Sequence, residues 1–411
     1  MIRRRQVFYV EGYDPRGAVG YYDLFVRAWK RCRGVWRFEG RLGELVLDSD
    51  LIAHWDIDAA GPNWQVAIRY EFLRLEGVIG ANMAEPMWRQ IPRALAWAID
   101  DHISGTTARI FRAAWRFELH LLYFQCLLLL WLLLSLGGGV AAALFATRLA
   151  GWPDLAAVGA GIVAAIGVFA LMRPLADRWQ VVQINSCWPY LREFARGEPS
   201  PFDRPIEAYA ARIVAAARLG ESEEIVVVGH SAAGVTAAAV MARALELDPD
   251  VGRHGPRLVL LTLGSVAPGA ALHPCAQRMR GVIARLASEQ SFTWIDCVSR
   301  KDVMNFWAFD PVAGIGVAAG ARRCNPITWP VRFKEVVSPE KYKRLRLSFF
   351  RLHYQFIMSG DRRSPYDYAM LVVGPAAVLD WASDPYALAA AFAPDGSFAP
   401  PVPADVAVAQ S

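Results

Sequence analysis

The chain has 411 residues, of which 55% are hydrophobic and only 20% are charged, so a largely disordered protein is excluded. Its 44 Lys and Arg against 39 Asp and Glu give a net charge of +5, too small for a dedicated nucleic-acid-binding protein. Six cysteines without a CxxC pair predict neither a disulfide framework nor a zinc site, and no metal or other cofactor is expected. The basic N-terminus lacks a following apolar segment, so no cleavable signal peptide is expected.

The N-terminal part predicts strands followed by a helix. The apolar run QVFYV at residues 6–10 predicts a first strand, and weak alternation over residues 36–75 is compatible with additional antiparallel strands. Residues 86–102 predict an amphipathic helix because apolar side chains recur at helical spacing, namely Trp88, Ile91, Leu95 and Ile99. Two interpretations of this stripe stay open: packing in a core, which we favour, or contact with a membrane surface.

Two long uncharged runs follow, over residues 121–146 and 155–172. Each is long enough to cross a hydrocarbon layer of about 30 Å as a helix. Both runs lack the polar stripe that helices in a soluble core normally keep. The sequence therefore predicts a two-helix transmembrane hairpin over residues 118–174; the first run is longer than a span needs, which is compatible with a tilt or with a break at Gly137–Gly139.

Basic residues around the hairpin predict its orientation. Five arginines flank the hairpin on its outer sides, whereas Arg148 is alone in the connecting loop; the five are Arg109, Arg112, Arg116, Arg173 and Arg178. This asymmetry predicts that both outer flanks, and hence both termini, are cytoplasmic. Only five of the 44 basic residues are Lys, a bias typical of GC-rich bacteria, so we expect a bacterial inner membrane protein.

After the hairpin, strands and helices alternate. Strands are predicted at 179–185, 225–228, 258–263 and 292–298, and helices at 206–219, 233–247 and 276–287. Near-continuous apolar strands separated by helices predict an α/β fold with a mostly parallel sheet covered on both faces. The expected organisation is an N-terminal part of the sheet domain at 1–117, the hairpin at 118–174, the main domain at 175–391 and a disordered tail at 392–411.

The sequence IVVVGHSAAG at 225–234 carries the clearest chemical signal. A buried strand leads directly into a Gly-x-Ser-x-small turn, and a helix follows. Such a turn holds a nucleophilic serine, here Ser231, in strained backbone, so its neighbours in the turn must be small, as Gly229, Ala233 and Gly234 are. The N–H of Ala232 would face a developing oxyanion at the helix start. His230 is adjacent to Ser231 and is expected to point elsewhere; a turn without chemistry is the other interpretation.

The GHSAAG turn, the LTLGS strand end at 261–265 and a late Asp and His resemble the α/β-hydrolase superfamily, specifically a bacterial membrane-anchored branch of its lipase/esterase-like members. The resemblance covers most of residues 180–355 and the first strand. It implies an α/β-hydrolase-like, mostly parallel sheet with helices on both faces, here interrupted by the transmembrane hairpin. It also implies that nucleophile, acid and histidine follow one another along the chain.

Asp302 is the expected acid, because it directly follows the strand at 292–298. Asp296 lies inside that strand and is interpreted as a paired structural carboxylate, and Asp310 as a turn residue. His353 is the only histidine downstream of all three acids and is therefore the expected base. By the resemblance, a second oxyanion donor comes from Gly12 or Tyr13, where this chain has Glu11-Gly12 in place of the usual His-Gly; an ordinary strand-exit turn is the alternative.

The predicted function is that of a membrane-anchored serine hydrolase that cleaves an acyl ester or thioester with a Ser-His-Asp triad. Its expected partners are the lipid bilayer and a small acyl-ester or lipid substrate, without nucleic acid. The alternative is a hydrolase-like membrane scaffold or partner-binding module that has no catalytic activity. A transporter is excluded because the two spans contain no charged residue. The sequence predicts neither the acyl chain nor the oligomeric state.

Overall fold

The computed structural model describes residues 1–318 and 322–400. The chain divides into two compact units. The first comprises Met1–Asn82, Arg112–Ala114 and the described residues from Leu191 onward, and the second comprises Met83–Phe111 and Trp115–Tyr190. Most of the second unit therefore lies in the sequence between the long N-terminal and C-terminal segments of the first, and each unit is described by itself.

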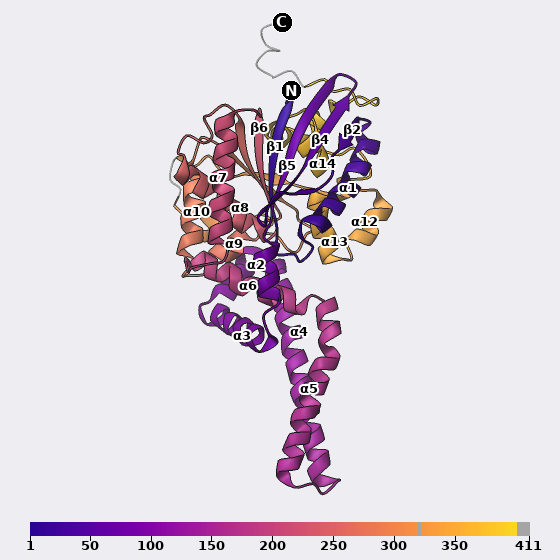
Figure 1. Cartoon of the computed structure of the whole chain (residues 1–411), viewed down its shortest axis with the longest axis vertical. Coiled ribbons are helices and arrows are strands. Elements are labelled where there is room, and N and C mark those ends of the chain that lie inside the picture. Colours follow the sequence, from indigo (N-terminus) through magenta and orange to yellow (C-terminus); the bar gives the residue numbers. More distant parts are fainter. Residues whose placement is uncertain (319–321, 401–411) are drawn as a thin grey trace. The chain divides into compact units, whose positions relative to one another are not determined.

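The first unit is built on one nine-stranded sheet with the order β2-β4-β5-β1-β6-β7-β8-β9, in which β3 pairs with β4 (Figure 1). Strand β1 pairs in parallel with both β5 and β6, and β6 to β9 continue in parallel. Strands β2, β3 and β5 are antiparallel to β4. The bounds are β1 Arg4–Val10, β2 Glu39–Leu42, β3 Val46–Leu47, β4 Ile52–Gly61, β5 Trp64–Leu73, β6 Glu224–His230, β7 Arg257–Leu263, β8 Thr293–Val298 and β9 Ile327–Pro330.

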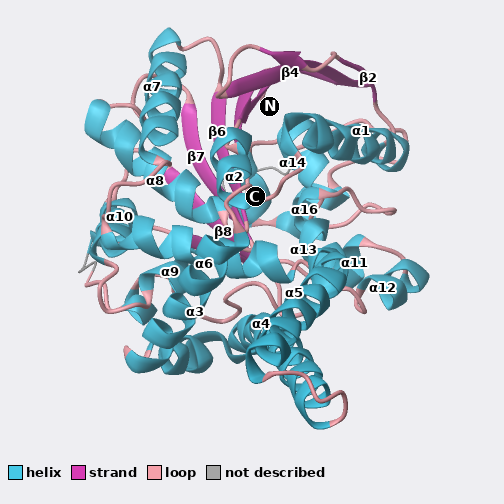
Figure 2. Cartoon of the chain, turned by 60° about the horizontal axis from the view of Figure 1, so that its bottom comes forward, coloured by secondary structure: helices cyan, strands magenta, loops and turns pink. Residues whose placement is uncertain are grey.

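Helices cover both faces of this sheet (Figure 2). Alternate residues of the parallel strands, such as Val7 and Tyr9 of β1 and Val226 of β6, share one hydrophobic cluster with residues of α1 and α14. Helices α7 and α8 pack together, and α8 contacts β6 and β7. The α-helices of this unit include α1 Gly17–Trp36, α2 Glu76–Met83, α7 Asp203–Leu219, α8 Ala233–Leu247, α9 Ala267–Ala271, α10 Gln277–Ser288, α11 Phe333–Val336, α12 Pro339–Leu345, α13 Phe349–His353, α14 Tyr368–Val373, α15 Val378–Ser383 and α16 Pro385–Ala390.

The structure confirms an α/β fold with a mostly parallel, mixed sheet. The strands predicted at 6–10, 225–228, 258–263 and 292–298 correspond to β1, β6, β7 and β8, and every residue of β6 is buried. The three helices predicted after residue 200 correspond to α7, α8 and α10. Antiparallel strands are present within residues 36–75, as expected.

Two predictions are wrong in this region. Residues 179–185 do not form a strand, because Val181 begins helix α6 (Val181–Arg196), whose buried apolar side chains continue at helical spacing through Trp188 and Leu191. The disorder expected from residue 392 does not hold for 392–400, since Phe392 pairs with Phe398 and both rings are buried. Residues 401–411 of the expected tail lie outside the described residues.

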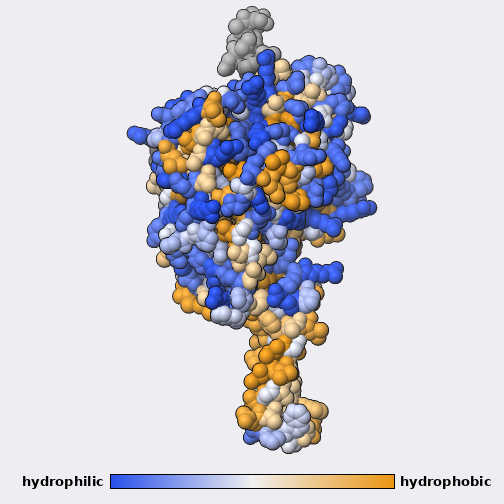
Figure 3. Space-filling view, in the orientation of Figure 1, coloured by the Kyte–Doolittle hydropathy of each residue, from blue (hydrophilic) through white to orange (hydrophobic). Residues whose placement is uncertain are grey.

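The second unit contains α3 (Met87–Ile103), α4 (Thr106–Arg148) and α5 (Asp154–Arg178). Helices α4 and α5 are long and apolar enough to cross a membrane, and Figure 3 shows the apolar surface along them. Their backbones approach closely, since a Cβ added to Gly139 would lie 2.7 Å from the carbonyl oxygen of Gly161. Helix α4 is unbroken at Gly137–Gly139, and its non-helical residue is Ala114 instead.

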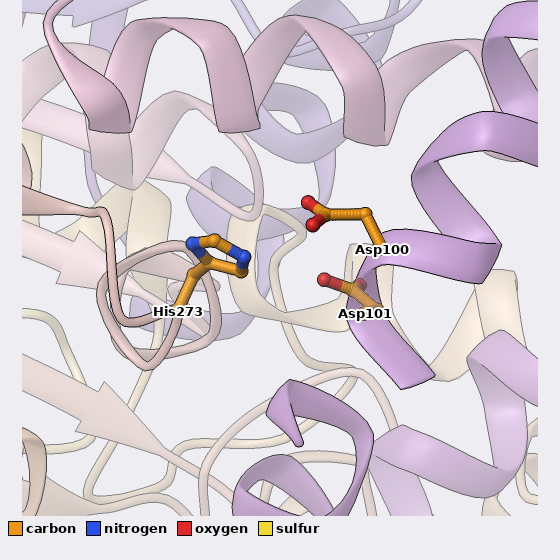
Figure 4. A group of neighbouring side chains, drawn as sticks. All are labelled: Asp100, Asp101 and His273. Atoms are coloured by element: carbon orange, nitrogen blue, oxygen red, sulfur yellow. The ribbon is translucent and has the colours of Figure 1, made fainter. Parts of the chain in front are cut away.

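Helix α3 was expected in the N-terminal part of the sheet domain, but it groups with the hairpin. The core-packing interpretation of its apolar stripe is wrong, because Trp88 and Ile99 are 68% and 58% exposed. Its buried residues are Gln90, Ala94, Trp97 and Asp101. Asp100 and Asp101 follow each other near the C-terminal end of this helix (Figure 4).

Candidate active site

Ser231 occupies the turn between β6 and α8 with a backbone φ of +60°, in the left-handed region that non-glycine residues rarely adopt. The backbone is held there from both sides: its N–H donates to the Leu263 carbonyl at 3.0 Å, and its carbonyl accepts from the N–H of Gly234 at 3.0 Å. The side chain is half-buried. A strained, anchored serine at a strand-to-helix turn is the geometry expected of a nucleophile.

Two glycines make this turn possible. A Cβ added to Gly229 would lie 2.6 Å from the Cβ of Ala237, and one added to Gly234 would lie 2.1 Å from the Oγ of Ser265. Neither distance is compatible with a side chain at that position. Ala233, the remaining small residue of the predicted turn, is buried as the first residue of α8.

The structure brings Asp302 and His353 together, although they are 51 residues apart in the sequence. The Nδ1 of His353 donates to the Oδ2 of Asp302 at 2.7 Å, and both side chains are at most 2% exposed. Asp302 is itself fixed, because its Oδ1 accepts from the N–H of Met304 at 2.9 Å. With the proton on Nδ1, Nε2 is left as the basic nitrogen; it is buried and has no hydrogen-bond partner among the described residues.

His353 lies beside the turn that carries Ser231. Gly264 follows Leu263, whose carbonyl oxygen accepts from the N–H of Ser231. A Cβ added to Gly264 would be 3.0 Å from the Cε1 of His353, so the His353 ring is close to this turn. The rings of His230 and His353 are 4.5 Å apart, and the Nε2 of His230 donates to the His353 carbonyl oxygen at 3.2 Å. Burial, with a smaller contribution from His353, holds the pKa of His230 well below its usual range, so His230 is neutral at neutral pH.

The loop after β1 also reaches this turn. Val10 is paired with Gly229, and a Cβ added to Gly12 would lie 3.6 Å from the carbonyl oxygen of His230. The N–H of Asp14 donates to the Gly12 carbonyl at 2.8 Å, which closes a tight turn. The hydroxyl of Tyr13 donates to Asn82, so this side chain has a partner in the same unit.

Sequence reasoning missed the carboxyl of Glu11 as a feature of this loop. Glu11 is fully buried; one oxygen accepts from the N–H of Leu75, and Oε1 has no partner among the described residues. Burial, with repulsion from Glu76 and Asp14, raises the pKa of Glu11 to about 8. The residue that replaces the usual histidine before Gly12 is therefore a neutral acid at neutral pH.

Two further contacts were not predicted. The hydroxyl of Tyr354 donates to Asp14, which ties the residue after His353 to the loop after β1. The amide of Asn305 donates to the carbonyl oxygens of Ser299 and Asp302, both at 2.9 Å, and so holds the loop that presents the acid. Adjacency to His353 and Asp302 was the only signal in the sequence that could have singled them out.

The other candidate acids have structural partners. Thr262 donates its hydroxyl to the Oδ1 of Asp296 at 2.6 Å, and burial raises the pKa of Asp296 to about 6. Asp310 accepts from two backbone N–H groups of its own turn and pairs with Arg323 at 2.6 Å. His273, labelled in Figure 4, accepts the N–H of Cys275 at 3.0 Å.

A cavity of about 950 Å³ is lined by Gly220, Glu223 and Arg257 among others. These residues precede or begin β6 and β7, so the cavity is at the amino ends of these parallel strands. Ser231 follows the carboxyl end of β6. The cavity is therefore at the opposite edge of the sheet from the serine.

The arrangement combines a strained serine, a buried His–Asp pair and backbone N–H groups at a helix start, which are the groups that acyl transfer by a serine nucleophile uses. Comparison of the chain with protein-family models, with curated proteins and with solved structures found no match.

Proposed function

We propose that this protein is a membrane-anchored serine hydrolase of the α/β-hydrolase type, which cleaves an acyl ester or thioester. The observation that carries the proposal is the buried Asp302–His353 bond, with an unpartnered Nε2, beside a serine whose φ is +60°. A turn with only a structural role can avoid the strained backbone that Ser231 adopts, and a histidine with only a structural role in a core normally has both ring nitrogens hydrogen-bonded. In this structure Nε2 does not bond the hydroxyl of Ser231, and it is left available to take the proton of that hydroxyl.

In the proposed reaction, Nε2 of His353 takes the proton of Ser231 as Oγ attacks the acyl carbonyl carbon. The carbonyl electron pair moves to the oxygen, which the N–H of Ala232 and one from Gly12 or Tyr13 would stabilise. On collapse, the imidazolium protonates the departing alcohol or thiol, and an acyl-serine forms. Water, deprotonated by His353, then releases the carboxylic acid and restores the serine.

The order of the sheet supports the proposal. Ser231 follows β6, Asp302 follows β8 two strands further along, and His353 follows β9. All three strands are parallel, so their carboxyl ends meet at one edge of the sheet. This is the chain order nucleophile, acid, histidine that the α/β-hydrolase resemblance implies.

Labelling with a fluorophosphonate probe tests the proposal. Ser231→Ala should abolish labelling, because only the attacking oxygen is removed. Ser288→Ala is the matched control: its hydroxyl bonds to Ala284 of its own helix α10, and the variant should label like the wild type. Labelling that persists in Ser231→Ala would refute the nucleophile. An unlabelled wild type that is folded would favour the alternative, a scaffold without catalytic activity.

For location we propose a bacterial inner membrane, with both termini cytoplasmic and the loop after α4 outside. Arg148 is the only basic residue near that loop, whereas five arginines flank the outer ends of the hairpin. The substrate would then come from the cytoplasm or the inner leaflet. In a cysteine-free background, Trp152→Cys in the loop should react with an impermeant maleimide on spheroplasts, and Leu219→Cys on α7 only after permeabilisation. The reverse pattern would overturn this topology.

A further inference from the structure

Helix α3 exposes large apolar side chains, and it buries polar residues beside Ala94 and Trp97. Its buried face includes two polar residues, Gln90 and Asp101. Large apolar side chains point outward, since Trp88, Ile99 and Ile103 are 68%, 58% and 81% exposed. A surface helix normally shows the opposite arrangement, with the apolar stripe inward.

These exposed side chains form one continuous face. Positions 88, 92, 95, 99 and 103 are separated by three or four residues, so they fall on one side of a helix. They are Trp88, Pro92, Leu95, Ile99 and Ile103, and Leu95 is half-buried. We call this set the outer face of α3. No charged residue interrupts it.

The opposite face of α3 is already occupied within the same unit. Ser186 of α6 donates its hydroxyl to the Oε1 of Gln90 at 2.8 Å. The Trp97 and Trp188 rings stack with their centroids 6.0 Å apart. The guanidinium carbon of Arg93 lies 4.5 Å from the centroid of the Tyr190 ring. These contacts fix the rotation of α3, so the outer face cannot be buried by turning the helix.

The chain around α3 indicates what covers this face. Only Ser104 and Gly105 separate α3 from α4, the first helix able to span a membrane. The first turns of α4 expose Phe111 and Trp115 next to arginines. Cation–ring pairs occur on both helices, with Arg89 at 4.7 Å from Trp88 and Arg116 at 5.2 Å from Trp115. Tryptophans and arginines at the end of a span are typical of the lipid headgroup region.

We propose that α3 is an interfacial helix whose outer face lies on the phospholipid surface of the membrane that α4 and α5 cross. Trp88, Ile99 and Ile103 enter the boundary between headgroups and acyl chains, and Arg89 and the arginines at the start of α4 bind anionic headgroups. The inference rests on the membrane anchoring in the proposed function, but not on the hydrolase chemistry. It gives the protein a third membrane-contacting helix that does not span the bilayer.

Depth-dependent quenching tests this inference with the full-length chain. A cysteine-free protein carries a fluorophore at Ile99→Cys, at Ile103→Cys or, as the reference for insertion, at Leu133→Cys in α4. Each is reconstituted in nanodiscs of equal parts phosphatidylcholine and phosphatidylglycerol, with a nitroxide either near the headgroup or near the acyl-chain end. At an insertion depth of about 5–10 Å, the shallow nitroxide should quench the α3 probes roughly twofold more than the deep one. The Leu133 probe should show the reverse preference.

The other outcomes are distinguishable. If Leu133 is quenched by the deep nitroxide but the α3 probes respond only to aqueous iodide, α3 is in water and the inference is overturned while the anchor stands. If neither the nitroxides in the lipid nor the iodide in the water quenches the α3 probes, protein covers the outer face, and the inference is again wrong. If Leu133 itself is reached only by iodide, the anchoring in the proposed function fails as well.

Discussion

Replacing Asp302 by Asn tests the buried His–Asp pair while preserving the shape of the side chain. The outcome depends on which way the new amide points. The N–H of Met304 donates to Oδ1 of Asp302 at 2.9 Å, and His353 donates to Oδ2 at 2.7 Å. The amide oxygen must therefore stay at the Met304 side, which leaves the NH₂ group facing Nδ1 of His353.

An NH₂ group facing Nδ1 reverses the tautomer of the ring. Nδ1 must then accept a hydrogen bond, so the proton moves to Nε2, and His353 can no longer take the proton of Ser231. A wrong tautomer in a triad of this kind costs a factor of about 10⁴ in turnover. That factor corresponds to about 5 kcal/mol of transition-state stabilisation.

The assay is the rate of p-nitrophenyl ester hydrolysis by purified protein in detergent, together with thermal unfolding as a check of folding. Asp296→Asn is the matched control, because it is a buried carboxylate of the neighbouring strand that pairs with Thr262 and not with a histidine. We expect it to remain close to wild type in turnover. Asp302→Asn that folds and retains turnover within tenfold of the wild type would refute the role of the pair.

Three further predictions concern the loop after β1, the end of β7 and the hairpin. The raised pKa means that folded Glu11 keeps its proton up to about pH 8 while the unfolded chain loses it near 4.5, so this residue contributes a fall in stability with rising pH between these values, of at most about 1.4 kcal/mol per unit. Glu11→Gln removes this contribution, so the difference in unfolding free energy between variant and wild type should change with pH over this range in chemical denaturation; parallel curves would contradict the raised pKa. Gly264→Ala should destabilise the fold by about 1–3 kcal/mol and slow acylation, since φ is +55° and the new Cβ meets His353 at 3.0 Å; unchanged melting and labelling would disprove this. Gly139→Leu should lower the melting temperature in detergent, whereas Gly137→Leu, with no atom within 4 Å of its Cβ, should not; equal effects would exclude the close helix contact.

The parallel strands were predictable because a fully buried strand is a short apolar run bounded by polar or glycine residues, as Ile225–Val228 is. The same rule failed at residues 179–185. Seven residues are too few to distinguish a strand from the first turns of a helix, and the β-branched pair at Val181 and Val182 favoured the wrong choice. The helix becomes visible only when the window extends to Phe194.

The candidate site was predictable only in part, for a related reason. The local pattern around Ser231 is contiguous, so the turn could be located from the sequence. Asp302 and His353 were selected by their order along the chain, and only the three-dimensional structure puts their side chains 2.7 Å apart. The protonated state of Glu11 could not be predicted, because its pKa depends on burial by residues distant in sequence.

Helix α3 shows why periodicity alone does not decide which face is buried. The spacing of Trp88 and Ile99 predicts a face but not its surroundings, since a core and a lipid surface both select apolar side chains. The polar residues on the other face carried the missing information, and Gln90 finds its partner in Ser186, which is 96 residues away.

The most direct test of the central claim is to trap an acyl-enzyme on Ser231. Full-length protein in detergent is mixed with a p-nitrophenyl ester, quenched in acid after one turnover, and digested for mass spectrometry. The account predicts a burst of one p-nitrophenol per chain and an acyl adduct on the peptide that contains Ser231. A folded protein that shows no adduct, or an adduct on another residue, would contradict it.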